Sequence, residues 1–193
     1  IHPSYFAFEK DLIKQEKENL EKATKSVITI ARQHFLKIGF PNYYRKLIEA
    51  NIQKDYSLCY PDVIGFRAGC SQPFFFFDVE QNKMTDLLLQ PSCFMDATFQ
   101  YYQPNKLINL EQEFLTIFNL LKKINGKLVP IFHNDLFIEN KFRNIFTFIN
   151  QQNLSIKSCG IIHIIVCIVY AIIPSHAIFI FFIASMQRVV TIV

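Results

Sequence analysis

The sequence DYSLCYPDVIGFRAGCSQPFFFFD spans Asp55–Asp78 and joins two predicted strands through a loop that contains two glycines. The continuous apolar run Phe74–Phe77 predicts a buried strand, because large aromatic side chains are usually packed in a core. Gly65 and Gly69 allow backbone torsions and close approaches that other residues resist. We therefore expect Arg67, held between them, to have an anionic partner and to face the active site if the chain has one.

Three histidines each follow a predicted strand elsewhere in the chain. His2 lies at a strand-to-loop junction, His34 follows the β-branched run 26–31, and His133 follows the strand expected at 127–132. Residues at the carboxyl ends of barrel strands gather on one face, where barrel enzymes place their active sites. The placement of the histidines predicts that they converge, and three independent histidines remain the alternative.

Helical periodicity alternates with these strands along the chain. Apolar residues at steps of three and four, or a proline in the first turn, predict helices at residues 9–25, 41–51, 107–124 and 142–149. Gly126 is placed to cap the third of them. Alternation of strands and helices predicts an α/β protein with a parallel sheet.

The composition fits one folded domain with a substantial core, since 51% of the 193 residues are hydrophobic and 19% are charged. The net charge of +4 is spread through mixed-sign segments, which argues against a nucleic-acid partner. Five cysteines without a CxxC pair indicate neither a disulfide framework nor a cysteine zinc knuckle. No signal peptide is recognisable, and the opening Ile-His-Pro-Ser-Tyr leads us to expect further sequence upstream.

The C-terminal part of the chain is strongly apolar. No Asp, Glu, Lys or Arg occurs from Gly160 to Met186, and residues 161–184 are long enough to cross a bilayer. Pro174 and the excess of β-branched residues suit two buried strands equally well. A membrane helix, buried strands and a tail that does not fold natively all stay open, and His163 and His176 are interpreted as structural.

Five short motifs occur one after another along the chain. They are HPSY at 2–5, RQHFLK at 32–37, the segment 55–78, MDATF at 95–99 and FHN at 132–134. In this order and at these separations, residues 1–150 resemble the later half of a polysaccharide deacetylase-like protein of the NodB-homology type. The resemblance implies an incomplete, deformed (β/α) barrel and a metal-dependent carbohydrate esterase that removes N- or O-acetyl groups from a glycan.

The resemblance also implies a metal site, with zinc as the expected divalent ion. His2 matches the first metal-binding histidine of the family's histidine motif. The second histidine of that motif would fall on Phe6, which leaves the site one ligand short. His34 is the candidate substitute, on its position after a strand.

Catalytic roles follow from the same resemblance. Arg67 matches the arginine that orients the catalytic base, His133 the late histidine that acts as general acid, and Asp96 the acidic residue that tunes it. The side chains expected to contact the sugar are Tyr5, Phe66 and Asn134.

The paired aspartates of the family's first motif do not occur in this chain, so we expect no turnover from it alone. The predicted organisation is a truncated barrel domain at 1–151 followed by an apolar tail at 152–193. The rival to a hydrolase is a degenerate, non-catalytic barrel that binds a glycan or associates with a membrane. A small integral membrane protein is a third reading, and the location stays open between cytoplasmic and membrane-associated.

Overall fold

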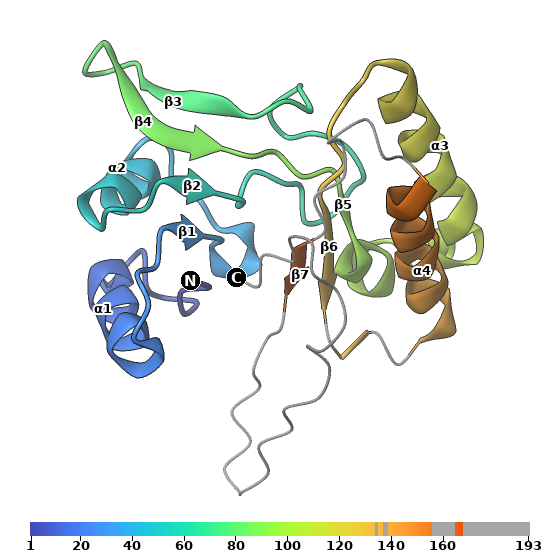
Figure 1. Ribbon diagram of the computed structural model, residues 1–193, viewed down its shortest axis with the longest axis horizontal. Helices are drawn as coiled ribbons and strands as arrows, with labels where there is room; N and C mark the ends of the chain where they lie inside the picture. Colours follow the sequence, from blue (N-terminus) through green and yellow to red (C-terminus); the bar gives the residue numbers. More distant parts are fainter. Residues whose placement is uncertain (134, 137–138, 156–164, 168–193) are drawn as a thin grey trace, which may run out of the picture.

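The computed structural model describes residues 1–133, 135–136, 139–155 and 165–167, and helices alternate with strands through most of this part of the chain (Figure 1). This confirms the predicted α/β class. The elements are α1 (Ile13–Thr24), β1 (Ile30–Ala31), the 3₁₀ turn η1 (His34–Leu36), α2 (Asn42–Glu49), β2 (Lys54–Asp55), β3 (Phe74–Asp78), β4 (Lys83–Leu89), β5 (Phe94–Met95), the π-helical turn η2 (Thr98–Tyr102), the 3₁₀ helix η3 (Pro104–Asn109), α3 (Leu110–Lys123), β6 (Pro130–His133), α4 (Asn140–Ser155) and β7 (Ile165–Cys167).

The strands form two sheets, and residues 90–93 connect β4 of the first sheet to β5 of the second. The first has the order β1-β2-β4-β3, in which β1, β2 and β4 are parallel, and the second is the parallel sheet β5-β6-β7. Past the end of β4, Gln90 N–H donates to the Asp55 carbonyl at 2.8 Å and Ser92 N–H to the Leu58 carbonyl at 3.0 Å. The pairing of β2 with β4 is thereby prolonged to the start of β5. The described strands do not close into a barrel.

The strand expected to be buried at Phe74–Phe77 lies instead at a sheet edge. It is β3, which pairs only with β4 in its sheet and runs antiparallel to it. Side chains alternate across a strand, so Phe76 is buried at 2% exposure while Phe75 is 52% exposed. A strand was predicted correctly here, but the burial of the whole aromatic run was wrong, because a sheet edge covered on one face buries only alternate side chains.

Helix α3 follows the predicted periodicity closely. Leu110, Phe114, Phe118 and Leu121 are its buried residues, at the spacing of one helical face. At its end Asn125 takes the left-handed conformation with φ of 52°, and Gly126 N–H donates to the Leu121 carbonyl at 2.7 Å. The glycine thus belongs to the C-terminal cap, one position after the left-handed residue.

Two large apolar cores, and a small cluster of Tyr56 and Val129, stabilise the described part of the chain. One packs α3 and α4 beside β5 and β6, and the other joins α1, α2, β1 and β4 (Figure 1). Tyr43 and Tyr44 of α2 are 0% and 1% exposed, so they pack in the second core as expected from the spacing of that helix. The two cores lie on either side of the segment that links the sheets.

Little of the apolar tail is described. Ile165–Cys167 form β7, which pairs parallel with β6, so this short piece belongs to a sheet. No helix in the described part of the chain is long and apolar enough to cross a membrane. The rest of the predicted 161–184 span, with His163 and His176, lies outside the described residues, as does Asn134.

Candidate functional site

A cavity of about 280 Å³ opens where the chain leaves β1, β5 and β6. His2, His34 and His133 all line it, together with Arg32. We call it the histidine cavity. Parallel pairing of β1 with β2 and of β5 with β6, and the continuity of β4 with β5, bring these strand ends to one edge of the structure, where His34 and His133 meet as predicted. The strand end expected at His2 was wrong, because residues 1–4 form no regular element. His2 is held beside β1 instead, since Arg32 N–H donates to the Ile1 carbonyl at 3.0 Å.

His2 and His34 lie beside each other, with ring centroids 4.8 Å apart. His2 Nδ1 is 2.7 Å from the Arg32 carbonyl oxygen, and because a carbonyl can only accept, Nδ1 donates and Nε2 carries the lone pair. Burial, followed by the Arg32 charge, lowers the pKa of His2 to about 4. Burial also lowers the pKa of His34, with His133 and Arg32 adding to the effect. Both rings are therefore neutral at pH 7.

His133 is held by Asp96, which is 0% exposed. The His133 ring nitrogen Nδ1 is 2.5 Å from Asp96 Oδ1, and the His133 backbone N–H donates to Asp96 Oδ2, also at 2.5 Å. Ala97 N–H donates to Oδ1 at 2.7 Å. Asp96 thus fixes the orientation of the imidazole and leaves its Nε2 without a bond to this carboxylate. The structure places the two residues together, as the motif order suggested.

Arg32 is the charged residue that the sequence did not single out. It is 1% exposed and lines the histidine cavity, and its Nη1 and Nη2 have no hydrogen-bond partner among the described residues. Burial lowers its pKa to about 10, so it stays protonated at neutral pH. An arginine directly after a buried strand and two residues before a histidine was the available signal. Asp135, an exposed carboxylate on the cavity wall, was also missed.

Arg67 lies near the histidine cavity but is not one of the residues that line it. Its side chain is exposed, and Nη1 donates to the carbonyl of Leu36, a cavity residue, at 3.4 Å. An exposed guanidinium is solvated by water, so the anionic partner expected for Arg67 is not required. Phe66 is half-buried and packs against the first core.

Exposed aromatic side chains lie beside His34. Tyr5, 40% exposed, meets His34 edge-on at 6.4 Å between centroids and Phe35 at 5.4 Å. Phe35 is 62% exposed and lines the cavity, and Phe6 is 50% exposed against Tyr5. Tyr5 is therefore near the mouth of the cavity, where a substrate contact was predicted.

The described residues hold no group of three or more His, Cys, Asp and Glu side chains that could bind a metal ion. His2 and His34 provide two imidazoles, whereas zinc sites in proteins use three or four protein ligands. Any further ligand would have to come from outside the described residues or from solvent.

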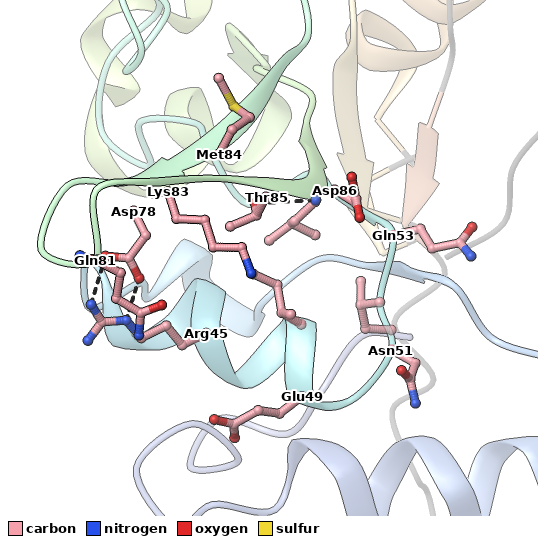
Figure 2. A pocket seen from close by; sticks show the side chains of 13 residues that line it. Arg45, Glu49, Asn51, Gln53, Asp78, Gln81, Lys83, Met84, Thr85 and Asp86 are labelled. Carbon is pink, nitrogen blue, oxygen red and sulfur yellow. Dashed lines mark hydrogen bonds and ion pairs between the residues drawn. The ribbon is translucent and has the colours of Figure 1, made fainter.

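A second cavity, of about 420 Å³, lies between α2 and β4 (Figure 2). Its charged groups are already paired at one end, where Arg45 donates to both oxygens of Asp78 at 2.6 and 2.7 Å and to Glu80 at 2.9 Å. No histidine or cysteine is among the residues that line it. Although it is larger, it offers less chemistry than the histidine cavity.

No protein-family model, no curated protein and no solved structure matches this chain.

Proposed function

We propose that the chain carries part of the site of a metal-dependent polysaccharide deacetylase, built on an incomplete, deformed (β/α) barrel and acting on N- or O-acetyl groups of a glycan. The observation that supports this most directly is the meeting of His2, His34 and His133 at one cavity. His34 follows β1 and His133 ends β6, whereas His2 lies in the N-terminal segment, and each belongs to one of the motifs on which the family resemblance depends.

His2 and His34 would hold the metal ion, for which zinc is the natural candidate. Both imidazoles are neutral at pH 7, which is the state that binds a metal. The bond from His2 Nδ1 to the Arg32 carbonyl is the kind of outer contact that orients metal-binding histidines and leaves Nε2 for the ion. A bound zinc ion would polarise the acyl carbonyl and lower the pKa of a bound water.

His133 would pass a proton to the leaving group. Asp96 occupies its Nδ1, so Nε2 is the nitrogen available to the substrate. A buried carboxylate that holds an imidazole in one orientation is the arrangement that general acid–base catalysis uses. Arg67, bonded to the Leu36 carbonyl, would act from the rim on a carboxylate base that the described residues do not supply.

Metal content tests this proposal without requiring turnover. The chain, loaded with zinc and dialysed, should retain about one ion per molecule by elemental analysis, and His2→Ala and His34→Ala should each lose it. His133→Ala is the matched control, since it removes an imidazole from the same cavity that is not assigned to the metal. Equal loss of zinc in all three variants, or no zinc in the wild type, would contradict the assignment.

A turnover assay tests the sequence-based expectation that the chain is inactive alone. Acetylated chitooligosaccharide is incubated with the chain, with and without added zinc, and released acetate is measured. Robust zinc-dependent release would show that the family's paired aspartates are not needed or are replaced, with Asp135 on the cavity wall as the first residue to substitute.

A non-catalytic glycan-binding module is the second candidate, and the exposed aromatic group of Tyr5, Phe6 and Phe35 favours it. Exposed rings beside a cavity give a sugar an apolar face to stack on. Glycan binding that persists in metal-free protein and is lost in Tyr5→Ala would favour this module over the hydrolase.

A further inference from the structure

Arg32 is a buried charge whose two end nitrogens find no acceptor among the described residues. Arg32 is 1% exposed, and neither its Nη1 nor its Nη2 has a hydrogen-bond partner among the described residues. A guanidinium removed from water without hydrogen bonds is strongly unfavourable, and buried charges in proteins are normally paired. Because Arg32 also lines the histidine cavity, an acceptor placed in that cavity is the simplest way to satisfy it.

The nearest carboxylates do not fill this role. Asp55 and Asp96 are close enough to Arg32 to favour its charged form. The oxygens of Asp55 accept from the hydroxyl and backbone N–H of Ser57 at 2.6 and 2.9 Å, and those of Asp96 accept from His133 at 2.5 Å. Both carboxylates are thus bonded to other groups, and neither of them bonds Nη1 or Nη2 of Arg32.

Two unpaired end nitrogens on one guanidinium suit a carboxylate ligand. Nη1 and Nη2 are the two end nitrogens of the planar guanidinium, which bind both oxygens of one carboxylate in parallel. The cavity of about 280 Å³ is small, and Leu36, Met95 and Ile131 give it apolar walls. This combination suits a short carboxylate with a small apolar group and disfavours a bulky or highly charged anion.

We propose that Arg32 forms a carboxylate-binding subsite in the histidine cavity, and that its ligand is a small monocarboxylate of the size of acetate. The subsite itself depends only on the placement of Arg32, whereas acetate as the natural ligand rests on the proposed function, because deacetylation releases it. The same geometry would hold a product, so acetate should compete with substrate in an active form of the protein.

The test uses the full chain after treatment with a chelator and follows thermal unfolding in sodium acetate against sodium chloride of equal ionic strength. At acetate concentrations about 100 times Kd, Tm should rise by about 5–10 °C above the chloride value. Arg32→Met should lose this response. It should also unfold at a higher temperature than the wild type without acetate, because a methionine of similar length removes an unpaired buried charge.

Arg67→Met is the matched control, since it removes an exposed guanidinium close to the same cavity and should keep the full acetate response. Arg32→Lys is a second variant, which tests the same assignment if Arg32→Met does not fold. It keeps the charge but loses the paired donors, and should need at least about tenfold more acetate for the same shift.

An acetate response that persists in Arg32→Met, or that disappears in Arg67→Met, would overturn the assignment. So would a wild type that responds no more to acetate than to chloride, which would mean that another group of the protein, or water, already satisfies Arg32. The readout needs neither metal nor substrate. Acetate binding by a chain that retains no zinc in the metal-content test would refute the proposed function and leave the subsite standing. Zinc retention without an acetate response would refute the subsite alone.

Discussion

Asp55 allows the electrostatics of the interior to be tested with one substitution. The residue is 0% exposed, and burial raises the pKa of its carboxyl from 3.8 to about 6, although hydrogen bonds from Ser57 and Tyr43 act in the opposite direction. Ser57 Oγ also accepts the backbone N–H of Gln33 at 2.8 Å. Asp55 therefore supports, through Ser57, the segment that carries Arg32 and His34 into the histidine cavity.

The sign of the pH effect follows from the direction of this shift. The folded state binds the Asp55 proton more tightly than the unfolded state, so stability falls as pH rises from the unfolded pKa to the folded one. A shift from 3.8 to about 6 corresponds to about 3 kcal/mol at full ionisation. Of this, about 2 kcal/mol should develop between pH values of about 4.5 and about 7. Asp55→Asn cannot ionise and should lack this contribution.

The measurement is the free energy of unfolding in urea at these two pH values, for the wild type and for Asp55→Asn. On going to the higher pH, the wild type should lose about 2 kcal/mol relative to the variant. Asp86→Asn is the control, because Asp86 is an exposed carboxyl on β4. A difference that does not change with pH, or a wild type that gains on the variant as pH rises, would show that the hydrogen bonds from Ser57 and Tyr43 outweigh burial.

Three further substitutions or reactions test the packing. In Gly126→Ala the new Cβ would lie 2.6 Å from Leu121 Cδ2, so overpacking should cost about 1–3 kcal/mol in urea unfolding, and an unchanged midpoint would mean that the chain relaxes there freely. Phe94→Ala should cost about 3–5 kcal/mol, since the ring is 1% exposed in the first core, and a loss below about 1 kcal/mol would place it outside that core. A thiol reagent should label exposed Cys70 in the native protein and leave buried Cys59 unmodified, because burial raises the pKa of the Cys59 thiol to about 12. Comparable labelling rates at the two cysteines would contradict the structure.

Much of the element order could be read from periodicity. The spacing of apolar residues in α3 predicts the buried face of this helix correctly. The helix begins at Leu110 and not at the predicted residue 107, because Pro104–Asn109 form a 3₁₀ helix. A strand was predicted at 127–132, and β6 spans Pro130–His133. The gathering of the histidines at one cavity was predicted as well. Such features depend on local sequence and on the general geometry of parallel strands.

The burial of the two arginines could not be read in the same way. The glycines around Arg67 indicated a cramped loop, yet Arg67 is exposed and Arg32 is buried. Burial of a residue after a strand as short as Ile30–Ala31 depends on which distant segments pack near it, and the sequence does not show that Pro61, Met95 and Ile131 line the same cavity as Arg32. Likewise, four consecutive phenylalanines do not reveal that their strand lies at a sheet edge.

The two hydrogen bonds between Asp96 and His133 restrict the movement of the imidazole. Asp96 directly follows β5, and its carboxylate binds both the main chain and the ring of the last residue of the neighbouring strand β6. Backbone, carboxylate and imidazole therefore close a small loop of bonds, and the ring cannot turn away without losing its hydrogen bond to Asp96. An imidazole mounted in this way inherits the stiffness of the sheet, so its orientation requires no lid or substrate-induced movement.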